Sequence, residues 1–121
     1  MKTTIGITWI PRAREYFAKS IKTIDHKNVI VYPDGYDFPF PTPLEVRNLG
    51  DNVGCFKHYY RVLTDLVDNT DADIVGIFAD DLLYSKGWID KAIKPLEDDK
   101  VGYAVCYVPN GLKIRNGCAR S

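Results

Sequence analysis

Residues 74–81 of the chain read IVGIFADD, an apolar run that ends in two aspartates. A short apolar run of this kind is typical of a strand that is buried in a parallel sheet. In open α/β sheets, ligands bind beyond the carboxyl ends of the strands. The run therefore predicts a buried strand, and it puts Asp80 and Asp81 at the edge of the sheet where ligands bind.

Two further strands are predicted before this one. Residues 3–10 (TTIGITWI) and 28–32 (NVIVY) are apolar and rich in β-branched side chains, as strands are. Between them, residues 12–24 carry apolar side chains at every third or fourth position, as an amphipathic helix does. Strand, helix and strand within about 30 residues form a βαβ unit, which implies parallel strands.

The next segment, residues 33–54, is predicted to be irregular because it holds four of the seven prolines. Phe38 and Phe40 are predicted to anchor it to the body of the protein. A second helix follows, with Asn52 as its cap and with His58 on its exposed side. Its buried face is predicted to consist of Phe56, Tyr59, Tyr60, Leu63, Leu66 and Val67.

The C-terminal part is predicted to hold a third helix capped by Ser85, a strand over 101–108, a turn at 109–111 and a returning strand over 112–115. The alternation of strands and helices predicts an α/β fold, with an open, mostly parallel sheet flanked by helices on both faces. A length of 121 residues predicts a single domain over 1–121.

Composition excludes several classes of protein. Lys and Arg together number 16, as do Asp and Glu, and this zero net charge argues against nonspecific nucleic-acid binding. The three cysteines, Cys55, Cys106 and Cys118, form no CxxC pair, which favours a reducing compartment. No transmembrane segment or signal peptide is predicted, so we expect a cytoplasmic protein.

Special residues follow three predicted strands, and parallel strands bring them to one rim. Thr8 and Trp9 end the first strand, Asp34 follows the second, and Asp80 and Asp81 follow the third. Adjacent carboxylates repel each other unless a positive charge lies near, and Mg²⁺ or Mn²⁺ takes such oxygen ligands. The alternative for the aspartate pair is a solvated turn. Asp34 would accept a hydrogen bond from a nucleobase, or would only stabilise its own Pro-Asp-Gly turn.

Residues 48–54 (NLGDNVG) lead into the second helix. Glycine lets the backbone approach a ligand closely, and a helix N-terminus attracts phosphate. The segment is neither a Walker A loop nor a GxGxxG motif. Lys57, in the first helical turn, would meet a diphosphate or would simply be solvated.

These motifs resemble the nucleotide-sugar-binding half of glycosyltransferases with the A-type fold, especially the family 2-like group. The resemblance covers roughly residues 3–108 and rests on the order of four segments: ITWIPRAREYFAKSIKTI (7–24), NVIVYPDG (28–35), NLGDNVG (48–54) and IVGIFADDLLYSKGW (74–88). Each motif is loose, and their order and spacing are the more specific signal.

The resemblance implies a Rossmann-like domain that binds a UDP-sugar with Mn²⁺ or Mg²⁺. It implies that Asp34 contacts uracil, that Asp80 and Asp81 hold the metal and diphosphate, and that Thr8 and Trp9 flank the base. Asn52, Gly54 and Lys57 would lie near the donor, although Asn-x-Gly occurs twice, at 48–50 and at 52–54.

The chain departs from the family at three points. Pro33 replaces the first acid of the usual pair after the second strand, and Ala79 replaces the first aspartate of Asp-x-Asp. We expect the acceptor-binding half, which supplies the catalytic base in that family, to be absent. The domain is then either truncated or a minimal protein whose acceptor site is supplied otherwise, and its catalytic residue is unknown.

The expected function is metal-dependent transfer of a sugar from a UDP-sugar to the hydroxyl of an unknown acceptor. The alternative is a non-catalytic nucleotide-binding module of the same fold. A flavodoxin-like domain or a nucleotidyltransferase would need a phosphate-binding or glycine-rich loop after the first strand. The chain has Trp9-Ile10-Pro11-Arg12 there, which is a poor phosphate cradle.

Overall fold

The computed structural model describes residues 2–11, 14–24, 28–39, 43–80, 83–103, 113–115 and 118–120. The chain divides into two compact units, Met1–Lys86 and Gly87–Ser121, and each is described by itself. The single domain over 1–121 stays a prediction.

The first unit is built on a four-stranded parallel sheet. Its strands are β1 (Thr3–Trp9), β2 (Val29–Pro33), β3 (Glu45–Val46) and β4 (Ile74–Phe78), in the order β3-β2-β1-β4. The chain is therefore an α/β protein with an open parallel sheet, as predicted. The short strand β3 lies inside the segment that the sequence predicts to be irregular.

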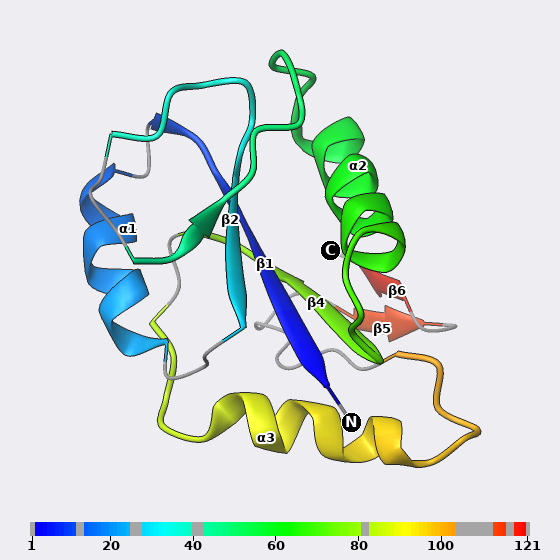
Figure 1. Ribbon diagram of the computed structural model, residues 1–121. Coiled ribbons are helices and arrows are strands. Elements are labelled where there is room, and N and C mark those ends of the chain that lie inside the picture. The colour runs from blue at the N-terminus through cyan, green and yellow to red at the C-terminus, as the bar shows by residue number, and fades with distance from the viewer. Residues whose placement is uncertain are drawn as a thin grey trace. The chain divides into compact units, whose positions relative to one another are not determined.

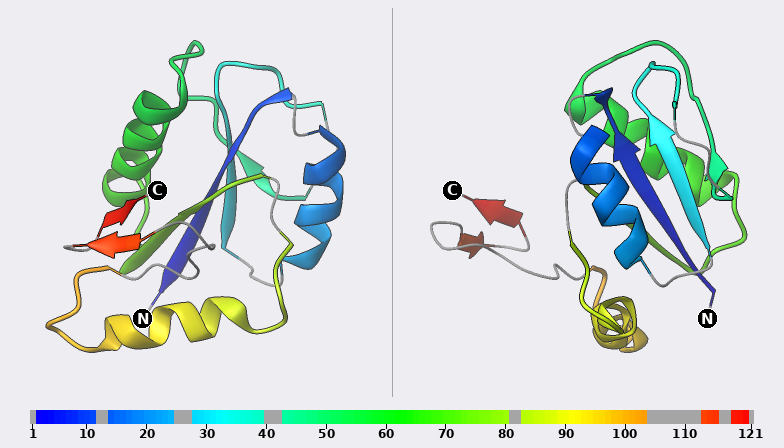
Figure 2. Two further views of the ribbon diagram at one scale, coloured as in Figure 1. Left: turned by 180° about the vertical axis from the view of Figure 1, so that it is seen from behind. Right: turned by 90° about the vertical axis from the view of Figure 1, so that its left-hand side faces the viewer.

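Helices cover both faces of this sheet (Figures 1 and 2). α1 (Arg14–Ser20) continues as the 3-10 helix η2 (Ile21–Thr23), and α2 (Cys55–Asp68) lies on the opposite face. Phe38 packs edge-on against both Trp9 and Phe17, with ring centroids 5.2 and 5.4 Å apart. The prediction that Phe38 anchors its loop is confirmed, whereas Phe40 lies outside the described residues.

The prediction for the buried face of α2 is wrong for four of its six residues. The side chains of Phe56, Tyr60, Leu63 and Val67 are exposed, whereas His58, Val62, Asp65 and Leu66 are buried. Val62 and Leu66 pack with Ile30 and Tyr32 of β2 in one core cluster. The polar residues His58 and Asp65 share this buried face because Tyr32 of β2 offers each of them a hydrogen-bond partner. A prediction from the spacing of apolar residues does not detect such partners.

The N-terminus of α2 also differs from the prediction. Gly54, with φ of 83°, occupies the N-cap position in place of Asn52. The carboxylate that accepts the backbone N–H groups at this helix end belongs to Asp34, directly after β2, as described below.

The second unit contains α3 (Trp88–Ile93), which continues as the 3-10 helix η3 (Lys94–Glu97). Gly87, not Ser85, is the N-cap residue. Residues 101–103 are not a strand, and the rest of the predicted strand and turn lies outside the described residues. β5 (Lys113–Arg115) pairs antiparallel with β6 (Cys118–Arg120). Among the helices that the structure describes, none has the length and apolar character needed to cross a membrane.

Candidate functional site

A crevice of about 540 Å³ opens at the carboxyl ends of β1, β2 and β4. The strand order makes this the switch point of the sheet, because the chain continues from β1 to β2 on one side and later returns to place β4 on the other. Ligands of open α/β sheets bind at such points. The lining residues are Thr8, Trp9, Ile10, Pro11, Asp34, Tyr36, Asn52, Gly54, Cys55, His58, Tyr59, Ala79 and Asp80.

Most of the predicted site residues come together here. Six of them line the crevice: Thr8, Trp9, Asp34, Asn52, Gly54 and Asp80. Lys57 is exposed and is not among the lining residues. Asp81 lies outside the described residues. Of the two Asn-x-Gly segments, 52–54 contributes to the crevice and 48–50 does not.

Asp34 accepts three hydrogen bonds through its carboxylate. Its side chain is 4% exposed. Oδ1 accepts hydrogen bonds from the Val53 N–H and from Nη2 of Arg61, both at 3.0 Å, and Oδ2 accepts one from the Gly54 N–H at 3.2 Å. Asp34 therefore binds the loop before α2 and does not stabilise its own turn.

The backbone of the same loop lies directly against the end of β2. Nδ2 of Asn52 donates to the Asp34 carbonyl oxygen at 2.9 Å. Gly35 has φ of 78°, and a Cβ on it would lie 2.0 Å from the Asn52 nitrogen. Only glycine allows this approach, so the loop at residues 51–54 is fixed to the rim of the sheet from two sides.

His58 and Arg61 complete the cluster, and the sequence analysis missed both. His58 is 3% exposed, against the expectation of an exposed side chain. Its Nε2 lies 2.8 Å from the Tyr32 carbonyl oxygen, and Nε of Arg61 donates to its Nδ1 at 3.0 Å. Because a carbonyl oxygen only accepts and a guanidinium only donates, Nε2 is the donor to Tyr32 and Nδ1 is the acceptor from Arg61. The 3.7 Å approach of Nδ1 to Oδ1 of Asp34 is therefore not an ion pair in this state.

Asp80 joins two strands across the crevice. It is 8% exposed, and its Oδ2 accepts a hydrogen bond from the Ile10 N–H at 3.1 Å. Trp9 is 1% exposed, so its ring belongs to the core although the residue borders the crevice. Tyr84 packs against Phe78 and donates from its hydroxyl to the Ala79 carbonyl oxygen at 3.0 Å.

Within the described part of the chain, no three His, Cys, Asp or Glu residues gather as a metal site. Mg²⁺ and similar ions often use one or two protein carboxylates and complete their shell with water and substrate phosphates. Asp80, which follows β4 and lines the crevice, fits this kind of sparse donor set.

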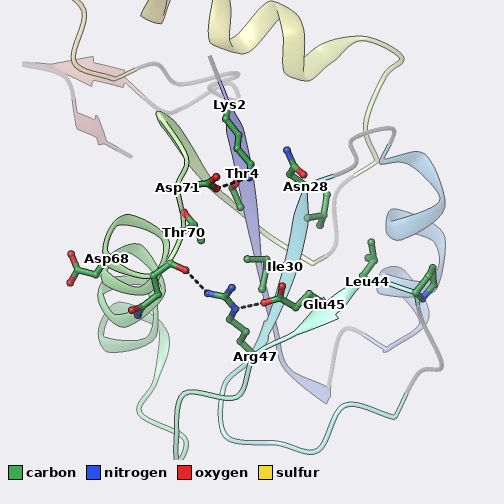
Figure 3. A pocket seen from close by; sticks show the side chains of 13 residues that line it. Lys2, Thr4, Asn28, Ile30, Leu44, Glu45, Arg47, Asp68, Thr70 and Asp71 are labelled. Atoms are coloured by element: carbon green, nitrogen blue, oxygen red, sulfur yellow. Dashed lines mark hydrogen bonds and ion pairs between the residues drawn. The ribbon is translucent and has the colours of Figure 1, made fainter.

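A second hollow, of about 600 Å³, lies at the amino ends of β1, β2 and β3 (Figure 3). Among the described residues that line it, the two cations are both ion-paired: Lys2 with Asp71, and Arg47 with Glu45 and Asp65. Behind it, Oδ2 of Asp65 accepts from the Tyr32 hydroxyl at 2.6 Å and from Nη1 of Arg47 at 2.9 Å.

The protonation of this cluster follows from its contacts. Burial, with the hydrogen bond to Asp65, raises the pKa of the Tyr32 hydroxyl. Burial acts to raise the pKa of Asp65 as well, but the hydrogen bonds from Tyr32, Arg47 and Asn69 outweigh it and hold that pKa below its ordinary value. Asp65 is therefore ionised and Tyr32 is neutral around pH 7.

The chain matches no protein-family model, no curated protein and no solved structure.

Proposed function

We propose that this chain is a donor-binding domain of a metal-dependent glycosyltransferase of the A-type fold, and that it binds a UDP-sugar in the crevice at the carboxyl ends of β1, β2 and β4. One observation carries the proposal. Four separate segments supply polar groups to a crevice at the switch point of a parallel sheet, namely Thr8, Asp34, Asn52 and Asp80.

Asp34 would read the base. An ionised carboxylate offers about four acceptor positions. Val53, Gly54 and Arg61 use three of them, two on Oδ1 and one on Oδ2. The second position of Oδ2 is the one that a ring N–H of uracil would use.

Asp80 and Asp81 would hold Mn²⁺ or Mg²⁺ together with the diphosphate. The metal, when bound, neutralises the charge that develops on the UDP leaving group. The N-terminus of α2 is at the same crevice through Gly54 and Cys55, and its N–H groups favour phosphate. Lys57, one turn into α2 and exposed, would act on the diphosphate only from the outer side.

A second candidate, a non-catalytic nucleotide-binding module, is favoured by the lining of the crevice. Among the described lining residues, the carboxylates are Asp34 and Asp80, and both bind the backbone of their own chain. Both ring nitrogens of His58 are hydrogen-bonded as well. None of these three groups is placed to deprotonate an acceptor hydroxyl, so turnover would need a base from elsewhere.

Calorimetric titration of UDP tests the donor site. Wild type should bind UDP with Mn²⁺ and not with EDTA, and Asp80→Asn should weaken binding at least about tenfold, a change of about 1.4 kcal/mol. Asp68→Asn is the matched control, because Asp68 is an exposed aspartate at the far end of α2. A UDP affinity that is the same with Mn²⁺, with EDTA and in Asp80→Asn would overturn the proposal.

Release of UDP separates the two candidates. If UDP-sugars bind and UDP is released in the presence of acceptor sugars, the chain is an enzyme. If they bind and stay intact under every condition, the chain is the binding module.

A further inference from the structure

We propose that Arg61 is a positioning residue: it holds the loop at residues 51–54 against Asp34 and thereby forms one wall of the crevice before any ligand arrives. The inference rests on the proposed function only for the identity of the ligand. Arg61 itself is not among the residues that line the crevice, so it acts through others.

Three nitrogens of one guanidinium group bind three different segments. Nη2 donates to Oδ1 of Asp34 after β2, and Nη1 donates to the Asp51 carbonyl oxygen in the loop. Nε donates to Nδ1 of His58, one turn earlier on α2. The three distances are 3.0, 2.9 and 3.0 Å. The planar arrangement of donors in arginine allows this, and a lysine ammonium does not reproduce it.

The loop depends on Asp34, and Asp34 depends on Arg61. The carboxylate accepts the N–H groups of Val53 and Gly54, the two residues directly before α2. Without Arg61, this nearly buried carboxylate would keep two amide donors and lose its cationic partner. A buried charge without its partner is strongly unfavourable, so the carboxylate would turn toward water and release the two amides.

This arrangement bears on affinity. Asn52 and Gly54 line the crevice from this loop. A loop that is already ordered spares the ligand the entropy of ordering it, which is how preorganisation raises affinity. Losing the Arg61 contacts should therefore weaken nucleotide binding although no ligand contact is removed.

The test combines amide hydrogen exchange with titration of UDP and Mn²⁺ in Arg61→Met and Arg61→Lys. We expect faster exchange at Val53 and Gly54, unchanged exchange in β1 and β4, and about tenfold weaker UDP binding. Arg47→Met is the matched control, because Arg47 also donates to a buried aspartate, Asp65, but lines the other hollow and not the crevice. It should lower stability and leave both the loop exchange and the UDP affinity unchanged.

Arg61→Lys separates positioning from charge. It keeps a cation near Asp34, so a role of the charge alone predicts full recovery of loop protection and affinity, and that recovery would overturn the inference. If Arg61→Lys restores neither the loop protection nor the UDP affinity, the result supports the inference. This comparison with wild type remains possible if Arg61→Met does not fold. If wild type binds no UDP, the donor proposal fails, whereas the exchange at Val53 and Gly54 still decides whether Arg61 holds the loop.

Discussion

An aspartate–arginine pair lies at each end of the sheet, and the two aspartates differ in their other hydrogen-bond partners. At the carboxyl end, Asp34 accepts a hydrogen bond from Arg61, and at the amino end Asp65 accepts one from Arg47. The other partners of Asp34 are backbone N–H groups of a loop. Those of Asp65 are the side chains of Tyr32 on β2 and of Asn69 directly after α2.

Because of this difference in partners, we expect Asp34 to shape the crevice and Asp65 to stabilise the fold. Asp34 arranges a loop whose residues face a crevice, and its loss should act mainly on that loop. Asp65 ties α2 to β2 and to the segment after β3. The two cations in the described lining of the neighbouring hollow, Lys2 and Arg47, are both ion-paired (Figure 3). Four predictions test the comparison.

Asp65→Ala should have the largest effect. It leaves the buried Tyr32 hydroxyl without its acceptor and removes one of the two carboxylate partners of the partly buried Arg47. The lost hydrogen bonds together should cost about 3–5 kcal/mol of unfolding free energy. Urea denaturation measures this loss of unfolding free energy. Asp68→Ala, on the exposed side of the same helix, should change stability by less than about 0.5 kcal/mol. A loss below about 1 kcal/mol in Asp65→Ala would mean that the cluster of Tyr32, Arg47, Asp65 and Asn69 (the amino-end cluster) does not tie the helix to the sheet.

Gly35→Ala should come next. Its Cβ would lie 2.0 Å from the Asn52 nitrogen, at a φ of 78° that disfavours other residues. Strain and displacement of the loop together should cost about 2–3 kcal/mol. Gly87→Ala shares the positive φ, but its Cβ meets no atom within 4 Å, so it should cost only about 1 kcal/mol. Equal losses in thermal or urea unfolding would show that the close approach of loop and strand is unimportant.

Stability should depend on pH through the amino-end cluster. The folded-state pKa of Asp65 lies below its ordinary value of 3.8, so this contribution is present above that value and is lost as the pH falls through the lower, folded-state pKa. The pKa of Tyr32 is raised, so its contribution is present below about pH 10 and is lost as the pH rises further. Unfolding free energies measured across the pH range should show both declines, and Asp65→Asn should reduce the acid one. An unchanged acid decline in that variant would assign it to other carboxylates.

Asn52→Ala should have the smallest effect, about 1 kcal/mol, because it removes one partly buried hydrogen bond to the Asp34 carbonyl oxygen. It should also weaken UDP binding. Asn48→Ala removes only an exposed contact to the Gly50 N–H and should leave UDP binding unchanged. The reverse result would place the functional Asn-x-Gly segment at 48–50.

The sheet and its rim could be predicted because parallel strands leave a strong local signal. The apolar runs gave β1, β2 and β4, and parallel topology then brought Thr8, Asp34 and Asp80 to one edge. The strand β3 has only two residues and exposed side chains, so no periodicity marks it.

The cluster around Asp34 could not be predicted, because its partners are distant in sequence. The N–H groups of Val53 and Gly54 are satisfied by a carboxylate 19 and 20 positions earlier, which leaves no capping signal at the helix itself. His58 and Asp65 are buried because Tyr32 offers a carbonyl oxygen to one and a hydroxyl to the other. The apolar side chains of α2 therefore do not mark its buried face, because that face includes the polar residues His58 and Asp65.

The chain has two tryptophans, and each of its compact units contains one of them. Trp9 packs edge-on against Phe38 in the core of the first unit, and Trp88 is the first residue of α3 in the second. Intrinsic fluorescence therefore carries two separable signals. With one indole replaced by phenylalanine, the emission of the other reports the melting of its own unit, so the chain contains its own pair of optical probes for whether the two units unfold as one.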